Sequence, residues 1–220
     1  MPATEILLIR HGQTTWNKMK RLQGHSDAPL NEKGMLQAAA LAETLKDEVL
    51  HAIYASDMQR AWRTAEKIAE FHNLPVTRMP ALRERCYGAF EGLTHAEIEE
   101  RYPEMYAAWD AADPDLVFPA GERVAESPRA FYHRAMDALR SCAANHKGKK
   151  IAIVTHYGII EAAFRTATNT PLNERLRMPV FNTSINRFSV DGDEFRMIAW
   201  GEAEHLEPLR KKSPEQYKPL

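Results

Sequence analysis

Two continuous apolar runs stand out in the pattern of hydrophobic and polar positions along the chain. Residues 6–9 are Ile-Leu-Leu-Ile, and residues 151–154 are Ile-Ala-Ile-Val. Uninterrupted apolar runs of this length are typical of parallel strands that are buried on both faces of a sheet. Each run is followed by a histidine and a glycine turn, in Arg10-His11-Gly12 after the first and in His156-Tyr157-Gly158 after the second.

Helix-like and strand-like segments alternate along the rest of the chain. Apolar residues recur at helical spacing between residues 35 and 45 and again between residues 60 and 68. Short strands are indicated at 51–55 and, as an edge strand, at 76–79. A helix is indicated at 157–168, directly after the second buried strand. This alternation predicts a layered α/β fold.

Local signals mark where several of these elements begin and end. Residues 184–190 and 195–200 are expected to pair as a hairpin across Asp191-Gly192-Asp193. Residues 1–207 are expected to form one domain, and residues 208–220, rich in Lys and Pro, a disordered tail. Three helix starts carry capping signals: Ser56 or Asp57 before the helix with Arg60, Thr94 with Glu97, and Ser127-Pro128 before a helix that runs to about Asn145.

Composition narrows the classes of partner. The 220 residues carry a net charge of −1, so neither nucleic acid nor an anionic membrane is an expected partner. No apolar run approaches the length that spans a bilayer, and the first residues lack the basic stretch of a signal peptide. With only two cysteines, far apart at Cys86 and Cys142, we expect a cytoplasmic protein with reduced thiols. The oligomeric state stays open, a homodimer included.

Three turns are expected to bring cations and imidazoles to one edge of the sheet. Arg10 and His11 follow the first buried strand, Arg60 lies in the first turn of a helix, and His156 follows the later buried strand. The carboxyl edge of parallel strands is where such sheets bind ligands. Guanidinium groups bind phosphate oxygens in pairs, and a bound anion would explain a cation placed at a helix start. Each residue alone is commonly structural, but together they predict a phosphate site.

Rival chemistries find no support in the sequence. The nine histidines include no H-x-H or H-x-x-x-H pair, and no C-x-x-C occurs, so a zinc site is not expected. The nucleotide-binding motifs and the serine-hydrolase motif G-x-S-x-G are also missing from the sequence.

Five motifs in order resemble the histidine phosphatase superfamily, the phosphoglycerate mutase-like proteins. The resemblance runs from about Glu5 to Leu206 and implies a three-layer α/β/α sandwich with a mostly parallel central sheet and neither metal nor cofactor. The segments that carry it are Leu8-Ile-Arg-His-Gly-Gln-Thr-Thr-Trp-Asn17, Gln23 to Asn31, Ala55 to Ala65, Leu82 to Gly92 and Val154 to Gly158.

The resemblance also implies residue roles. His11 would attack phosphorus and become a phosphohistidine, while Arg10, Arg60 and His156 would hold the phosphoryl group. Glu84 would donate the proton to the leaving group. Further residues expected to bind phosphate or substrate are Asn17, Gln23, Gly24, Tyr87 and Tyr157.

Some of these residues have plainer alternatives. Glu84 could be a surface carboxylate paired with Arg83 or Arg85, with Glu91 and Glu97 as competing carboxylates. We expect Cys86 to be a packed thiol and Trp62 and Phe90 to be core residues rather than parts of the site.

Phosphatases and mutases of this kind share one phosphate pocket. Tyr87 before Gly88 favours a mutase, but residues 101–125 lack paired basic residues and carry acidic ones, and Tyr157 departs from the mutase pattern. We therefore expect a metal-independent phosphatase acting on a small phosphorylated metabolite. A phosphoglycerate mutase is the alternative and a non-catalytic phosphate-binding module a lesser one. Substrate choice is expected to lie in residues 101–125, and the sequence does not name the ester.

Overall fold

A six-stranded sheet with strand order β3-β2-β4-β1-β5-β6 forms the centre of the molecule. The computed structural model describes residues 2–176 and 178–212. Strands β3, β2, β4 and β1 run parallel, and β5 and β6 continue the sheet in antiparallel fashion. The bounds are β1 Thr4–Arg10, β2 Ala52–Ala55, β3 Val76–Arg78, β4 Lys150–Thr155, β5 Ile185–Asp191 and β6 Glu194–Glu202.

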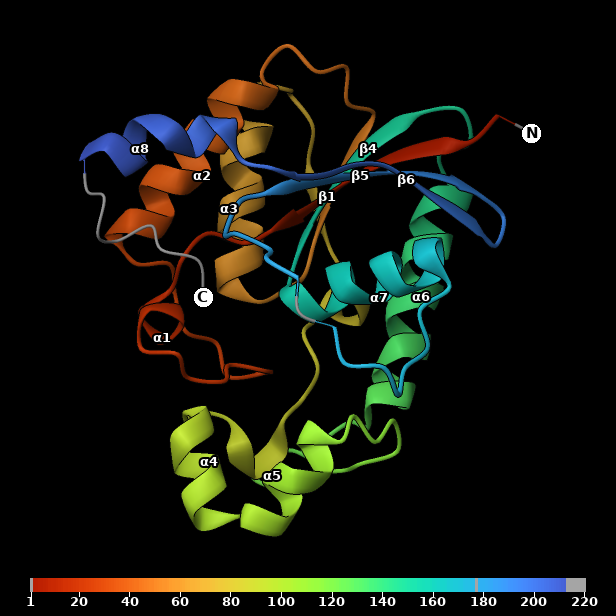
Figure 1. Cartoon of the computed structure of the whole chain (residues 1–220). Coiled ribbons are helices and arrows are strands. Elements are labelled where there is room, and N and C mark those ends of the chain that lie inside the picture. Colours follow the sequence, from red (N-terminus) through yellow and green to blue (C-terminus); the bar gives the residue numbers. More distant parts are fainter. Residues whose placement is uncertain (1, 177, 213–220) are drawn as a thin grey trace.

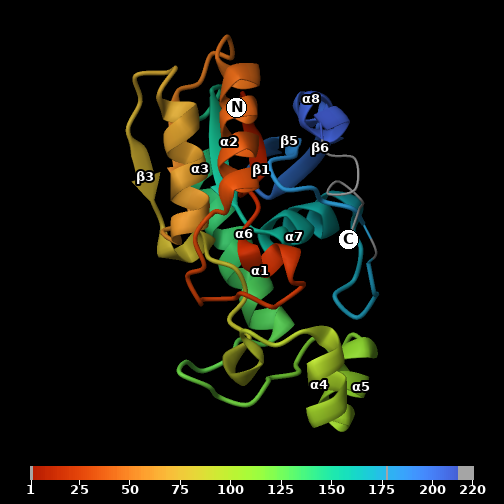
Figure 2. The same ribbon diagram turned by 90° about the vertical axis from the view of Figure 1, so that its left-hand side faces the viewer.

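Helices cover both faces of the sheet (Figures 1 and 2). Successive side chains of a strand point to opposite faces, so β1 and β4 each supply both cores. Leu7 and Ile9 pack under α2 (Glu32–Leu45) and α3 (Gln59–Ala69). Ile6 and Leu8 pack under α6 (Pro128–Ala144) and α7 (Tyr157–Thr168). The expected three-layer α/β/α sandwich is thereby confirmed.

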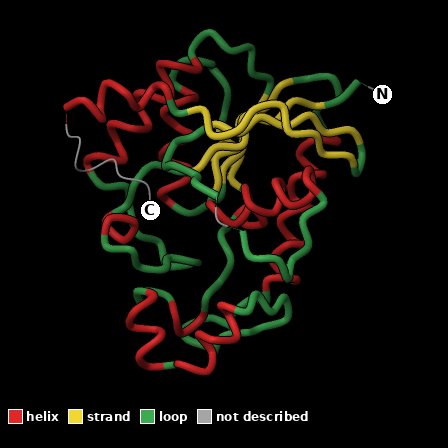
Figure 3. Tube along the Cα trace, in the orientation of Figure 1, coloured by secondary structure: helices red, strands yellow, loops and turns green. Residues whose placement is uncertain are grey.

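A small helical cap stands apart from the sheet. It contains α4 (His95–Arg101) and α5 (Pro103–Asp110), which lie well away from the strands in Figure 3. Phe90, Ile98 and Phe118 form its own apolar core. The short helix α1 (Thr15–Lys18) and the turns Pro80–Leu82, Gly88–Phe90 and Glu204–Leu206 complete the connections.

Two of the three predicted helix-start signals are confirmed, and one is wrong. Thr94 forms its capping box and Ser127 caps α6. The N-cap of α3, however, is Met58, whose side chain makes no capping hydrogen bond. Ser56 fails as a cap because its Oγ accepts only the N–H of Met58, at 3.3 Å, and lies before the helix.

The expected C-terminal tail is partly helical. Helix α8 (Glu207–Lys212) follows directly from the turn at 204–206, so the disorder expected from residue 208 is wrong as far as residue 212. Leu206 is buried at the start of this segment. Residues 213–220 lie outside the described residues. In the described ranges, no helix has the length and apolar character needed to cross a membrane.

Candidate active site

The two histidines meet because their strands are neighbours. Arg10 at the end of β1 pairs with Thr155 at the end of β4, and the N–H of His11 donates to the carbonyl of Thr155 at 2.9 Å. The chain therefore delivers His11 and His156 side by side at the carboxyl edge. Their ring centroids are 5.1 Å apart, at an interplanar angle of 62°.

His11 is held as a neutral imidazole of one tautomer. Its Nδ1 lies 2.7 Å from the carbonyl of Gly12, and because a carbonyl can only accept, Nδ1 carries the proton. Nε2 is then the nitrogen with a free lone pair. Burial, together with the charges of Arg60 and Arg10, holds the pKa of His11 well below its ordinary value of 6.5. The ring is therefore neutral at physiological pH.

Arg60 is a buried cation fixed by backbone carbonyls. It lies in the first turn of α3 with only 1% of its side chain exposed. Its Nη1 and Nη2 donate to the carbonyls of Ser26 and Gly24, at 2.9 and 2.7 Å. Burial lowers its pKa to about 10, so it stays charged at neutral pH. Gly24 has a φ of +50°, and a Cβ there would lie 2.2 Å from a carboxylate oxygen of Glu91, so only glycine fits.

Several buried polar atoms of the site have no partner among the described residues. They are the Nε atoms of Arg10 and Arg60 and both ring nitrogens of His156. Buried polar groups in native proteins are almost always hydrogen-bonded, and convergent cationic donors suit a phosphate. Arg10 is also anchored by donating from Nη1 to the carbonyl of Val180 at 2.6 Å. The geometry is that of a fixed anion site.

Glu84 is a buried carboxyl that faces the same cavity. Its exposed fraction is 8%, which excludes the surface alternative. Its Oε1 accepts the N–H of Arg85 at 2.8 Å, and its Oε2 accepts the N–H of Gly158 at 3.1 Å. Burial raises the pKa of Glu84 from its ordinary value, although these two hydrogen bonds and the nearby Arg60 and Arg10 oppose that effect. Arg83 pairs with Asp57 instead, in a bidentate contact of 2.6 and 2.7 Å.

The competing carboxylates have structural roles. Glu91 accepts hydrogen bonds from the backbone of His25 and from the hydroxyl of Ser26, which ties two loops together. Glu97 closes the capping box of α4 and pairs with Arg21 at 2.8 Å. Neither carboxylate lines the cavity.

The prediction that Cys86 is a packed thiol and Phe90 a core residue is confirmed. Cys86 is buried, and burial raises the pKa of its thiol, which keeps it protonated. Phe90 is fully buried in the core of the cap. Trp62 is only partly buried, and the guanidinium groups of Arg63 and Arg78 each lie over its ring, with Cζ 4.0 and 3.8 Å from the ring centroid.

All of the predicted site residues line one cavity of about 610 Å³ between the sheet edge and the cap. Gln23 is fixed because its Oε1 accepts the hydroxyl of Thr14 at 2.9 Å, and Asn17 closes the capping box of α1 with the same threonine. The residues brought together are Arg10, His11, Asn17, Gln23, Gly24, Arg60, Glu84, Tyr87, His156 and Tyr157.

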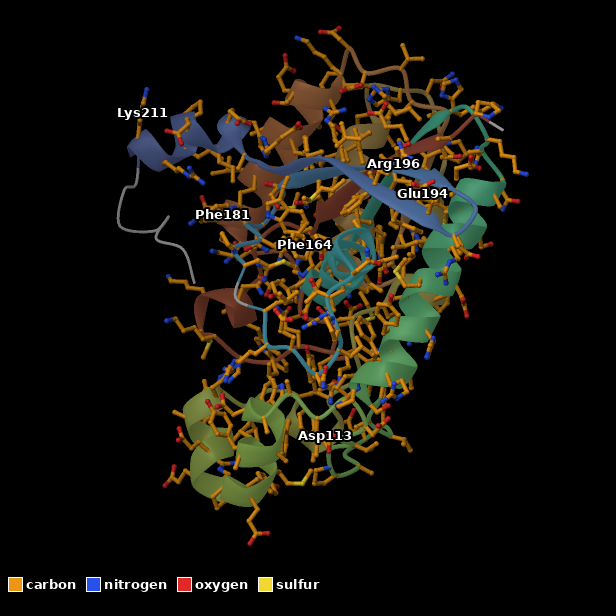
Figure 4. The ribbon with its side chains drawn as sticks, turned by 45° about the vertical axis from the view of Figure 1, so that its right-hand side comes forward. Asp113, Phe164, Phe181, Glu194, Arg196 and Lys211 are labelled. Atoms are coloured by element: carbon orange, nitrogen blue, oxygen red, sulfur yellow. The ribbon has the colours of Figure 1, made fainter. Side chains whose placement is uncertain are left out.

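The outer wall of the cavity comes from two segments. Tyr106, Trp109 and Asp113 belong to the segment in which substrate choice was expected, and Asp113 lies where the cap faces the rest of the molecule (Figure 4). No pattern in the sequence pointed to the other segment, at 172–176, where Arg175 pairs with Asp110 of the cap. This ion pair joins the two walls across the cavity.

Sequence reasoning also missed a residue that fixes the backbone of His11. Asn182 is buried, and its Nδ2 donates to the carbonyl of His11 at 2.8 Å. No local signal marks Asn182, because the contact spans most of the chain. Within residues 2–176 and 178–212, no group of three His, Cys, Asp or Glu side chains is placed to hold a metal ion.

The chain is similar over most of its length to a known family and to several known proteins. The histidine phosphatase superfamily (branch 1) profile matches residues 6–203. Two Arabidopsis thaliana proteins match over 92% of this chain. Phosphoglycerate mutase-like protein 4 is 37% identical over 87% of its own length, and the metal-independent phosphoserine phosphatase is 38% identical over 83%. The solved structure of Bacillus stearothermophilus YhfR is 35% identical, with a TM-score of 0.84 over 93% of this chain and 100% of its own.

These relatives support a phosphomonoester hydrolase, and they include mutase-like proteins as well. Because the family profile spans most of the sequence, the chain belongs to the histidine phosphatase superfamily, branch 1.

Proposed function

We propose that this chain is a metal-independent phosphatase that hydrolyses a small phosphate monoester in two displacements at His11. The observation that carries the proposal is the neutral tautomer of His11, which lines one cavity together with Arg10, Arg60 and His156. A neutral imidazole is the form that can attack phosphorus.

In the first displacement, the Nε2 lone pair of His11 forms a bond to phosphorus as the bond from phosphorus to the alcohol oxygen breaks. Glu84 gives its proton to that oxygen, so a neutral alcohol leaves. Arg10, Arg60 and His156 stabilise the charge on the transferring group. In the second displacement, water attacks phosphorus and gives its proton to the Glu84 carboxylate. The N–P bond then breaks, which releases phosphate and restores His11.

The cap favours a phosphatase over a mutase. A mutase must hold a bisphosphate, and the carboxylates that the cap contributes to the cavity wall, Asp110 and Asp113, would repel the high negative charge of a bisphosphate. Asp110 is moreover paired with Arg175, so the charge of that arginine is already balanced by a carboxylate of the cap. Mutase activity remains the second candidate because of the mutase-like relatives and of Tyr87 before Gly88. A non-catalytic module is less well supported, since the residues that the proposed chemistry uses all line one cavity.

Phosphoserine is the first ester to test, because one close relative is named for its hydrolysis. We propose a reducing compartment such as the cytoplasm as the site of action. Cys86 and Cys142 are both free and buried, which suits that setting.

The test is phosphate release from a panel of monoesters in EDTA, for the wild type and for His11→Ala. The panel contains phosphoserine, 3-phosphoglycerate and p-nitrophenyl phosphate. We expect release by the wild type and a loss of about a thousandfold or more in His11→Ala. Activity that EDTA abolishes, or that His11→Ala retains, would overturn the proposal. Isomerisation of phosphoglycerate without phosphate release would establish the mutase instead.

A further inference from the structure

The segment at 81–84, here called the donor loop, carries Glu84 and pairs with no strand among the described residues. Buried carbonyls outside a ladder need other donors. Side chains from distant elements supply them: the hydroxyl of Thr155 donates to the carbonyl of Leu82 at 2.8 Å. The Nε2 of His25 lies 3.0 Å from the carbonyl of Glu84. Its first residues form the local turn Pro80–Leu82, and the carbonyls that this turn leaves free are held by tertiary contacts.

Arg134, in α6, makes the most extensive of these contacts. Its Nη1 donates to the carbonyls of Ala81 and Arg83, at 2.8 and 3.0 Å, and its Nη2 donates to the carbonyl of Glu84 at 3.1 Å. One planar guanidinium therefore holds three carbonyls of the donor loop. A lysine could not do this, because its single ammonium lacks the fixed fork of donors.

Glu126 completes the arrangement from the other side. Its two carboxylate oxygens accept from Nε and Nη2 of Arg134, both at 2.7 Å, which fixes the plane of the guanidinium. Oε2 of Glu126 also accepts the N–H of Cys86 at 2.9 Å. The pair thus grips the chain on both sides of Glu84.

Neither member of the pair lines the cavity, so neither can touch the substrate. We propose that Arg134 and Glu126 are positioning residues for the proton donor: they hold the donor loop so that the Glu84 carboxyl stays against Gly158 and faces the leaving group. This inference rests on the proposed role of Glu84 as proton donor.

The consequence is selective. A displaced proton donor slows the hydrolysis of an alkyl ester, because an alkoxide leaving group needs a proton. It has little effect on the hydrolysis of p-nitrophenyl phosphate, because a nitrophenolate leaves without one. Loss of Arg134 should therefore reduce hydrolysis of an alkyl phosphate much more than hydrolysis of p-nitrophenyl phosphate. General damage to the fold would reduce both equally.

The experiment compares Arg134→Gln and Arg134→Lys with Glu84→Gln and with the double variant that combines Glu84→Gln and Arg134→Gln. Arg140→Gln is the matched control. Arg140 lies on the same helix and pairs with Asp137 and Asp193, away from the donor loop. For each protein, kcat/KM is measured with the best alkyl ester of the panel and with p-nitrophenyl phosphate. Thermal unfolding is recorded for every variant.

We expect the ratio of alkyl to aryl kcat/KM to fall about a hundredfold in Glu84→Gln. In Arg134→Gln and Arg134→Lys it should fall about tenfold, as expected for a donor that is misplaced rather than removed. In Arg140→Gln it should stay within about twofold. In the double variant the ratio should match that of Glu84→Gln alone, because the two residues act as one unit.

Equal losses on both esters in the Arg134 variants, or a further fall of the ratio in the double variant, would overturn the inference. A ratio that is unchanged in Glu84→Gln would instead overturn the donor role itself. The two failures can therefore be told apart. Arg134→Lys keeps the charge, so it provides the comparison if Arg134→Gln unfolds.

Discussion

The Oε2 atom of Glu84 accepts a hydrogen bond from the backbone N–H of Gly158 at 3.1 Å, so the carboxyl sits on the first turn of α7. This contact needs glycine: a Cβ on residue 158 would lie 2.3 Å from Oε1 of Glu84 and 2.8 Å from the ring of Phe131. The close approach of the Glu84 carboxyl thus requires a residue without a side chain at position 158.

Gly158→Ala should therefore damage the site and the fold together. The added methyl must displace either Glu84 or Phe131, and such overpacking costs about 1–3 kcal/mol of unfolding free energy. We expect that loss in urea unfolding and a stronger loss of activity on alkyl esters than on p-nitrophenyl phosphate. An alanine variant with unchanged stability and unchanged leaving-group preference would contradict the described packing.

The pH profile of kcat should carry a limb from Glu84. Burial raises the pKa of this carboxyl, and it must be protonated to donate, so kcat on an alkyl ester should fall as pH rises through that raised pKa. The acid limb should lie well below pH 6.5, because burial and two arginines depress the pKa of His11. Steady-state kinetics across pH check this. If Glu84→Gln keeps the alkaline limb of the wild type, the limb belongs to another group.

His156 should make the fold sensitive to acid. Burial, with the charge of Arg60, holds its pKa well below the value of 6.5 that applies in the unfolded chain. Between these two pKa values the unfolded chain binds the extra proton, so stability falls as pH is lowered from 6.5. The slope reaches about 1.4 kcal/mol per pH unit for each such group.

Urea unfolding of wild type and His156→Gln at about pH 7 and about pH 5.5 measures this effect. The variant should lose less stability on acidification than the wild type, and His11 should account for part of what remains. Equal acid sensitivity in both proteins would mean that His156 does not stay neutral in the folded chain.

Substrate choice should depend on Trp109. Its ring stacks on His95, with centroids 4.7 Å apart, and forms part of the cavity wall away from the phosphate site. Trp109→Ala should raise KM for the preferred ester by about tenfold, as loss of one pocket contact does. Inhibition by inorganic phosphate should stay unchanged, because the phosphate contacts come from other loops. An equal change in the KM for the ester and in the inhibition constant for phosphate would mean that the cap shapes the phosphate site itself.

The residues proposed to bind phosphate could be predicted from the sequence because they follow strands or lie at helix starts. His11 and His156 could be placed together because parallel strands end at one edge of a sheet. The burial of β1 and β4 could be predicted from their uninterrupted apolar runs. Glu84 could not be placed that way. Its loop has no periodic pattern, and only the family resemblance singled it out.

The features that were missed depend on contacts between distant parts of the chain. Arg134 looks like any helix-surface arginine until the donor loop is folded against it. Asn182 reaches His11 from near the other end of the chain. The predicted N-cap residue of α3 was wrong for a similar reason: Asp57, a plausible N-cap residue, is instead bound to Arg83.

Detection of a phosphohistidine tests the central claim most directly. Wild type and His11→Ala are mixed with phosphoserine and with p-nitrophenyl phosphate, quenched in alkali within one turnover, and analysed by mass spectrometry of peptides. We predict one phosphoryl group on His11 of the wild type, formed in EDTA and lost when the quenched sample is acidified. A wild type that turns over either ester with no phosphoryl group on His11, or with one on another residue, would contradict the account.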